Sequence, residues 1–141
     1  MGCLEKMAKG FNMEVKSYDK FSNYRGEKDL YEVLQSDIVS LHIPLPGNEA
    51  FFNLELLEKM KPSACLINTS RMGILNKKDF LFSLKQGIIY KAAIDFTDDD
   101  EILEHSKTSD NLILTNHIGG RTYEDSEAVE SFIIKQIENY V

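Results

Sequence analysis

The fold is decided by the stretch Ala64-Cys65-Leu66-Ile67-Asn68, which is followed at once by Thr69-Ser70-Arg71. A short, mostly apolar run that ends in polar residues is typical of a strand buried in a parallel sheet. Similar runs recur along the chain, and we predict strands at Met13–Tyr18, Asp37–Ile43, Ala64–Asn68, Tyr90–Ile94 and Leu112–Thr115. Because most of these runs do not alternate with polar residues, we expect both faces of the sheet to be covered.

Segments with helical spacing of apolar residues separate these runs. We predict helices at Leu30–Leu34, Leu54–Met60 and Lys78–Gln86, the last one ending at Gly87. A final helix is predicted to begin at Thr122, with Asp125 completing the cap. Its apolar face comprises Val129, Phe132, Ile133, Ile137 and Tyr140. Strands that alternate with helices predict an α/β fold, a doubly wound, Rossmann-like parallel sheet in three layers.

The composition is that of an ordinary globular domain. The chain has 141 residues, 43% of them hydrophobic and 28% charged, and a formal net charge of −7. Its acidic balance argues against nucleic-acid binding, and no apolar run approaches the ~20 residues that span a membrane. The N-terminus lacks a signal-peptide pattern, and the two cysteines, Cys3 and Cys65, show no disulfide framework or metal spacing. We therefore expect a cytoplasmic protein without a metal.

Polar or turn-forming residues follow each predicted strand. They are Asp19, Pro44, Thr69–Arg71, Asp95 and His117. In open α/β sheets, ligands bind beyond the carboxyl ends of the strands, so these positions are candidates for a site. Any one of them is equally consistent with an ordinary loop residue. The set, which includes an arginine and a histidine, favours a functional site.

Six motifs in collinear order resemble the NAD-binding domain of the D-isomer-specific 2-hydroxyacid dehydrogenases. They are Phe11–Asp19, Ser36–Leu45, Leu57–Pro62, Ile67–Arg71, Gly87–Asp95 and Thr115–Gly120. The resemblance implies NAD as cofactor, with contacts from Asp19, Ile43, Pro44, Thr69, Asp95, Gly119 and Gly120. Asp19 is similar to the acid that accepts hydrogen bonds from the adenosine ribose, although an exposed turn aspartate explains it as well. Asp95 is similar to the acid that orients the nicotinamide carboxamide.

The resemblance also implies a reaction, the transfer of a hydride between NAD(H) and a D-2-hydroxy acid or 2-keto acid. Arg71 matches the residue that grips the substrate carboxylate, for which a planar guanidinium is well suited. His117 matches the acid/base that moves the hydroxyl proton. Asp100 stands where the family has the glutamate that orients this histidine. Glu101 is an alternative partner, and a solvated acidic loop at 98–101 is a further interpretation.

The sequence departs from the family pattern at several positions. Met72 replaces a glycine after the arginine, and we expect its side chain to crowd space left open for the ligand. Asn116 replaces the proline before the histidine, and Glu49 lies where a threonine or asparagine often touches the cofactor. The sequence also contains no G-x-G-x-x-G phosphate-binding loop. Together these departures suggest relaxed function.

Gly2 and the segment Leu4–Phe11 resemble the end of that loop and the helix after it. We therefore expect residues 1–141 to be one NAD-binding domain that lacks its first strand, with the substrate domain absent. Such a chain is expected to form a homodimer and to be inactive alone. The alternative is a non-catalytic Rossmann-like interaction module related to the family. An unrelated flavodoxin-like regulatory domain is the third interpretation.

Overall fold

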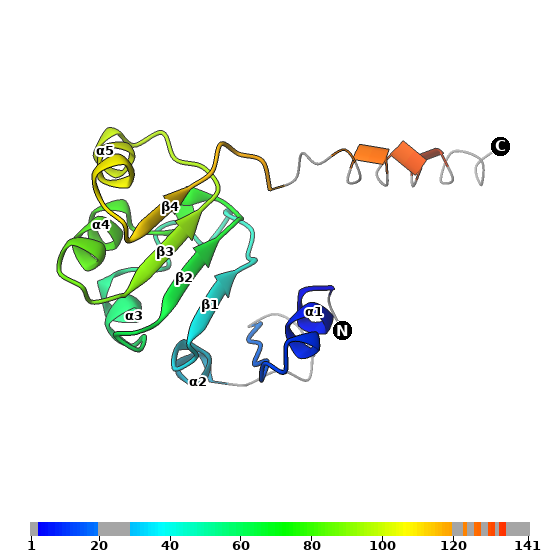
Figure 1. Cartoon of the computed structure of the whole chain (residues 1–141), viewed down its shortest axis with the longest axis horizontal. Helices are drawn as coiled ribbons and strands as arrows, with labels where there is room; N and C mark the ends of the chain where they lie inside the picture. Colours follow the sequence, from blue (N-terminus) through cyan, green and yellow to red (C-terminus); the bar gives the residue numbers. More distant parts are fainter. Residues whose placement is uncertain are drawn as a thin grey trace.

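The computed structural model describes residues 3–19, 29–119, 123, 126, 127, 130, 131, 133 and 134. Its centre is a four-stranded parallel sheet in the order β1-β2-β3-β4 (Figure 1). The strands are β1 (Ile38–Leu41), β2 (Cys65–Asn68), β3 (Lys91–Ile94) and β4 (Leu112–Leu114). Leu41 is aligned with Asn68, Asn68 with Ile94, and Ile94 with Leu114, so the carboxyl ends of the strands lie along one edge. The predicted α/β class with a parallel sheet is confirmed.

The predicted strand at Met13–Tyr18 is wrong. Residues 13–19 form neither strand nor helix, whereas the other four predicted strands are found with slightly shorter bounds. A strand exists only through hydrogen bonds to a neighbour, and the four strands of this sheet pair only with one another. A strand-like residue pattern alone could not supply that partner.

The helices are α1 (Cys3–Gly10), α2 (Leu30–Leu34), α3 (Leu54–Glu58), α4 (Lys77–Lys85) and α5 (Asp100–Thr108), with a 3₁₀ turn at Met72–Ile74. Side-chain caps explain where four of them begin. Asp29, Asn53, Asn76 and Asp99 each accept a hydrogen bond from a backbone amide of the first turn of α2, α3, α4 and α5 respectively. The sequence interpretation missed α5, although Asp99 before Ile102 is a helix-start signal.

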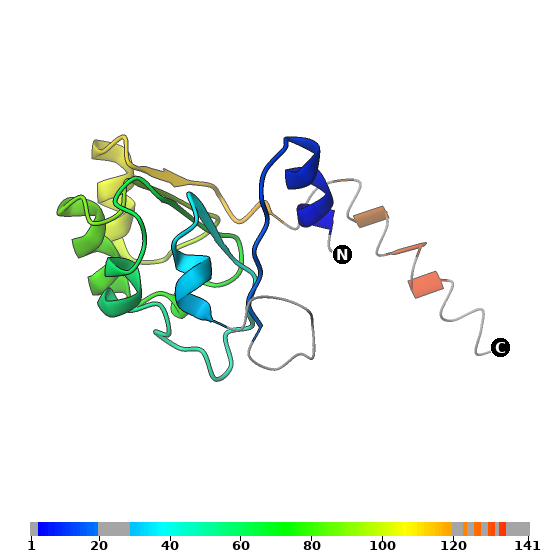
Figure 2. The same cartoon turned by 90° about the horizontal axis from the view of Figure 1, so that it is seen from below.

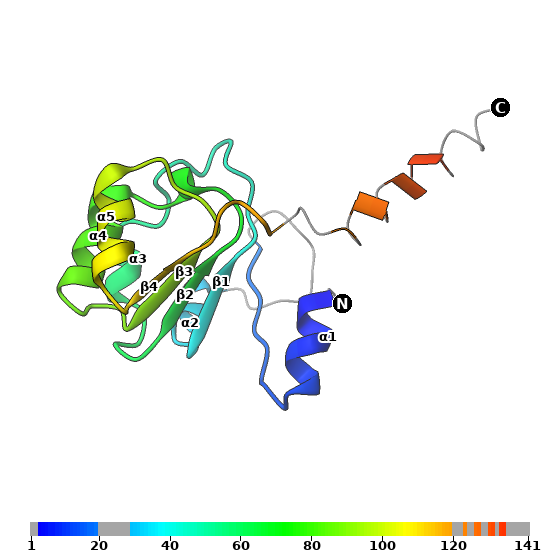
Figure 3. The same cartoon turned by 45° about the horizontal axis from the view of Figure 1, so that its top comes forward.

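The three crossover helices α3, α4 and α5 lie on the same side of the sheet, as Figures 1 and 3 show. Helix α2 precedes β1 and is joined to α3 by the hydrogen bond from the Tyr31 hydroxyl to Glu55. Since successive strands are neighbours and the order never reverses, connections of one hand place every crossover helix on one face. Burial accordingly alternates along the strands, with Leu66 and Ala92 buried and Ile67 and Ala93 half-buried. The expectation that both faces are covered is therefore wrong for the described part of the chain.

The core lies between the sheet and these helices. Its most buried side chains, each at most 2% exposed, are Leu34, Phe52, Leu57, Ala64, Leu66, Ile74, Leu75, Phe80, Leu84, Ile89, Ile94 and Ile102. Helix α1 contributes none of its residues to this core and stands apart from the sheet in all views (Figures 1 to 3). The sheet and its helical layer thus form the body that carries the site.

The predicted C-terminal helix is helical at Tyr123, Ser126, Glu127, Glu130, Ser131, Ile133 and Ile134. Thr122, Asp125, Val129, Phe132, Ile137 and Tyr140 lie outside the described residues. Among the helices that the structure describes, none combines the length and apolar character needed to cross a membrane.

Candidate functional site

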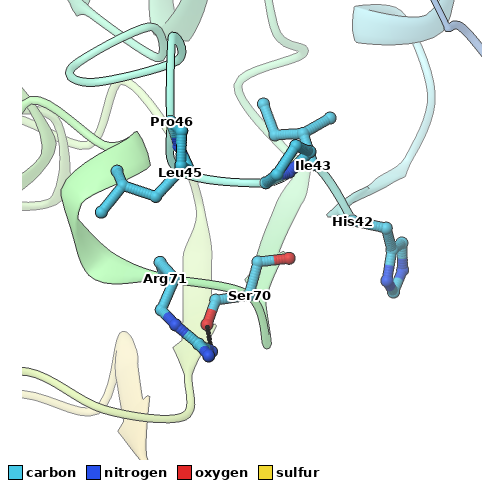
Figure 4. A pocket seen from close by; sticks show the side chains of 7 residues that line it. His42, Ile43, Leu45, Pro46, Ser70 and Arg71 are labelled. Atoms are coloured by element: carbon cyan, nitrogen blue, oxygen red, sulfur yellow. Dashed lines mark hydrogen bonds between the residues drawn. The ribbon is translucent and has the colours of Figure 1, made fainter.

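A cavity of about 520 Å³ lies at the carboxyl ends of β1 and β2 (Figure 4). Its volume is in the range of small-molecule sites. The loop after β1 and the turn after β2 supply its lining, which is His42, Ile43, Pro44, Leu45, Pro46, Ser70 and Arg71. Three residues expected at the site, Ile43, Pro44 and Arg71, therefore share one cavity. This cavity offers an apolar wall and one guanidinium.

The Arg71 side chain is exposed and folds back along its own turn. Its Nη1 donates a hydrogen bond of 2.9 Å to the carbonyl oxygen of Ser70 (Figure 4). A guanidinium carries five N–H donors, so most of them remain available to a ligand. The group can thus pair with an anion in the cavity without first breaking a salt bridge, since no ion pair of Arg71 occurs among the described residues.

A buried amide closes the turn that carries this arginine. Asn68, the last residue of β2, is 3% exposed. Its Nδ2 donates to the carbonyl oxygen of Arg71 at 3.0 Å, and its Oδ1 accepts from the amide of Ser70 at 3.0 Å. The sequence interpretation missed Asn68; a polar residue at the end of an otherwise apolar strand was the available signal.

The Leu45 side of the cavity is packed against the 3₁₀ turn. A Cβ on Gly73 would lie 2.9 Å from Cδ1 of Leu45, so the absence of a side chain at Gly73 makes room for that leucine. The amide of Ala50 donates to the carbonyl oxygen of Gly73 at 2.8 Å, which fixes the loop beyond Leu45 to the same turn. The position of the Leu45 wall is therefore set by close packing.

Met72 does not crowd the ligand space. Its side chain is 8% exposed and belongs to the hydrophobic core. The expectation that it intrudes into the site is wrong because the 3₁₀ turn at Met72–Ile74 directs this side chain inward.

A second cluster lies beyond β3 and β4, around the carboxylate of Asp95. Its Oδ1 accepts hydrogen bonds from the Thr115 hydroxyl at 2.6 Å and the Ile118 amide at 3.0 Å, and its Oδ2 accepts from the Gly119 amide at 3.0 Å. The amide of His117 donates to the Asp95 carbonyl oxygen at 2.7 Å. One aspartate thus holds the whole loop from Thr115 to Gly119.

The protonation of Asp95 follows from these contacts. Burial, at 7% exposure, raises the pKa of this carboxyl. The hydrogen bonds from Thr115, Gly119 and Ile118, with the charge of His117, outweigh that effect and hold its pKa below the ordinary value of 3.8. The group is therefore an anion at neutral pH.

His117 has an unusual backbone and one aromatic neighbour. Its φ of 55° lies in the left-handed region, which the Asp95 hydrogen bonds stabilise. Its ring lies 5.1 Å from the ring of Phe96, measured between centroids. No hydrogen bond joins the described ring to Asp100 or Glu101. Asp100 instead begins α5, and Asp99 caps that helix.

The remaining expected residues lie elsewhere or outside the described part. Asp19 is exposed at the end of segment 13–19, and Thr69 is exposed in the turn after β2. Gly119 lies close to the Asp95 carboxylate, since a Cβ at this glycine would lie 3.0 Å from Oδ2 of Asp95. Gly120 lies outside the described residues.

Comparison with known proteins finds a matching family and relatives with reductase and dehydrogenase names. Residues 3–119 match the model of the D-isomer specific 2-hydroxyacid dehydrogenase, NAD binding domain. The chain is 34% identical over 144 residues to a glyoxylate reductase of Pyrococcus furiosus and 33% identical over 144 residues to a glycerate dehydrogenase of Methylorubrum extorquens. These alignments cover 95% and 98% of this chain but 43% and 46% of the relatives. The chain thus spans less than half the length of either relative.

Solved structures show the same fold, which is Rossmann-like. An acyclic imino acid reductase in complex with NADPH and D-Arg gives a TM-score of 0.81 at 31% identity, covering 96% of this chain and 45% of that one. An NAD-complexed D-isomer specific 2-hydroxyacid dehydrogenase from Lactobacillus delbrueckii ssp. bulgaricus gives 0.74 at 28% identity, covering 83% and 42%. The unrelated flavodoxin-like interpretation is therefore wrong. The chain belongs to the D-isomer-specific 2-hydroxyacid dehydrogenase family and corresponds to its NAD-binding domain.

Proposed function

We propose that this chain is the cofactor-binding part of an oxidoreductase that interconverts a D-2-hydroxy acid and a 2-keto acid with NAD(H). One observation carries the proposal. The Arg71 turn follows β2 and the His117 loop follows β4, with β3 between them, and the amide of Asp95, directly after β3, donates to the carbonyl oxygen of Asn68 at 3.1 Å. The same edge of the sheet therefore carries Arg71, a cation that can bind a carboxylate, and His117, an imidazole that can transfer a proton.

The residues fit one end of the cofactor. Ile43, Pro44 and Leu45 offer an apolar wall on which a flat ring can lie, and the cavity of about 520 Å³ is open beside Arg71. The chemistry supplied by bound NAD(H) is the donation or acceptance of a hydride. For the ribose we propose Asp19, and for the region beside the nicotinamide we propose Thr69, Asp95, Gly119 and Gly120.

The roles of the chain's own residues follow from their chemistry. Arg71 pairs with the substrate carboxylate through its planar fork and draws charge from the neighbouring carbonyl. His117 gives a proton to the carbonyl oxygen in reduction and removes it from the hydroxyl in oxidation. Asp100 is proposed to orient the imidazole, with Glu101 as the alternative. Among the described residues no hydrogen bond joins either acid to the ring, so this role requires α5 or the His117 loop to move.

A chimaera tests the proposal. Residues 3–119 are placed in the glyoxylate reductase of Pyrococcus furiosus in place of the part they match, so that the relative supplies everything else. We expect NADH oxidation with glyoxylate, lost on His117→Ala and strongly reduced on Arg71→Lys. A folded chimaera without activity contradicts the proposal and favours the interaction module. A homodimer is proposed as well, and light scattering of the chain at several concentrations tests it.

A further inference from the structure

We infer that Asn68 is a positioning residue, which fixes the direction in which Arg71 leaves the sheet. The inference deepens the proposed function, on which it rests for the role of Arg71 toward a carboxylate. The geometry of the turn itself stands independently of that role.

Both polar ends of the Asn68 side chain are engaged within the turn. Nδ2 donates to the carbonyl oxygen of Arg71, and Oδ1 accepts from the amide of Ser70, both at 3.0 Å. The amide therefore bridges residues 68 to 71 and holds the backbone on which the arginine is mounted. Because Asn68 is 3% exposed, water competes poorly for these hydrogen bonds.

The bridge is anchored on both sides. The carbonyl oxygen of Asn68 accepts from the Asp95 amide at 3.1 Å, and the Ser70 hydroxyl donates to the carbonyl oxygen of Leu41 at 3.0 Å. The carbonyl oxygen of Arg71 also accepts from the amide of Ile74 at 3.2 Å. The backbone of Arg71 is thus fixed from the sheet and from the 3₁₀ turn, while its side chain remains exposed in the cavity.

An amide is the side chain that this bridge requires. Asparagine presents one acceptor and two donors in a plane, whereas an aspartate of the same shape has no donor when ionised. Asn68→Asp therefore keeps the acceptor for Ser70 and places an oxygen against the carbonyl oxygen of Arg71. Asn68→Ala removes both contacts. The two variants separate the contact that matters for Arg71 from the one that does not.

The experiment is NMR on the 141-residue chain, with ¹⁵N relaxation at Arg71 and hydrogen exchange at Ser70. In the wild type we expect a rigid Arg71 backbone, with an order parameter of about 0.85. Asn68→Ala lowers it below about 0.6 and speeds exchange at the Ser70 amide by about tenfold, as loss of one hydrogen bond implies. Asn68→Asp lowers the Arg71 order parameter but leaves Ser70 protected. The matched control Ser70→Ala loses one anchor only, the contact to Leu41, and lowers the Arg71 order parameter less than either Asn68 variant does.

Other results overturn the inference. If exchange at Leu66 and Ile94 accelerates together with Ser70 while Arg71 stays rigid, Asn68 only stabilises the core. If neither Asn68 variant folds, we also conclude that Asn68 stabilises the core and does not position Arg71. A titration with oxamate, a 2-keto acid mimic, follows the Arg71 Nε–H signal in the chimaera loaded with NADH. Absence of a response in that chimaera counts against the proposed role of Arg71, whereas the relaxation data on the 141-residue chain still decide the role of Asn68.

Discussion

The amide of His117 donates a 2.7 Å hydrogen bond to the backbone carbonyl of Asp95, while the carboxylate of Asp95 accepts hydrogen bonds from the next two amides of the same loop. Successive amides that converge on an anion form a nest, and here the anion belongs to the protein itself. The acid beside the proposed proton-transfer residue therefore also shapes its loop.

The stability of the chain should fall in acid because of Asp95. Its pKa in the folded state lies below the ordinary value of 3.8, so its stabilising effect is present above that pH and is lost as the pH falls through the folded-state pKa. Urea unfolding between about pH 5 and pH 2.5 should show a steeper loss of free energy of unfolding in the wild type than in Asp95→Asn.

Asp98→Asn is the control for this experiment. A hydrogen bond from Lys77 lowers the pKa of Asp98 as well, but this side chain is 76% exposed. Solvent screens such a pair, so the variant should keep the slope of the wild type. Equal slopes for the wild type and Asp95→Asn would contradict the assignment.

Gly73→Ala should be costly only while Leu45 is present. The new Cβ would lie 2.9 Å from Leu45 Cδ1, the end of a flexible side chain, so we expect a loss of about 1 kcal/mol in unfolding free energy. In a Leu45→Ala background the loss should vanish, giving a coupling of similar size in a double-mutant cycle. The same loss in both backgrounds would mean that Gly73 is required for another reason.

Alanine substitutions at the adjacent residues Asp99 and Asp100 should affect the unfolding free energy differently. The Asp99 side chain accepts a hydrogen bond from the Ile102 amide at 3.2 Å and caps α5. Asp99→Ala should therefore lower the unfolding free energy by about 1 kcal/mol. Asp100→Ala, at an exposed position without a capping contact, should change it by less than about 0.5 kcal/mol. A reversed order in thermal or urea unfolding would contradict the capping arrangement.

The 141-residue chain on its own should show no measurable NADH oxidation with pyruvate, hydroxypyruvate or longer 2-keto acids. The chain spans 43% of the glyoxylate reductase that it matches, and a complete site needs groups beyond Arg71 and His117. NADH fluorescence should report weak binding or none, since the sequence has no glycine-rich phosphate loop. Turnover that His117→Ala abolishes would show that these residues suffice.

The sequence predicted correctly the helices and strands that depend on interactions within one segment or between adjacent segments. The runs around Val39, Leu66 and Ile94 are strands because each has a partner strand from the same series. Met13–Tyr18 is more polar, with Glu14, Lys16 and Ser17 among its six residues, and it pairs with none of these strands. Its residues do not show whether a partner strand is present. One-sided burial likewise depends on the strand order, which hydropathy does not encode.

The sequence predicted where the residues of the candidate site lie relative to the strands, but not which groups their side chains contact. The sequence placed Arg71 and His117 after strands, as the structure has them, because turn chemistry follows strand ends. The sequence did not predict that the Asp95 carboxylate accepts hydrogen bonds from the amides of Ile118 and Gly119, or that the Met72 side chain points into the core. Those outcomes depend on the path of the backbone in three dimensions.

The sheet that carries helices on one side only affects how the chain behaves at high concentration. Ile38, Ile67 and Ile113 leave apolar area on the side that no described helix covers. At neutral pH the net charge of −7 provides colloidal repulsion between molecules. As acid neutralises the carboxylates, that repulsion fades while the apolar area stays, so mildly acidic buffers are where self-association sets in.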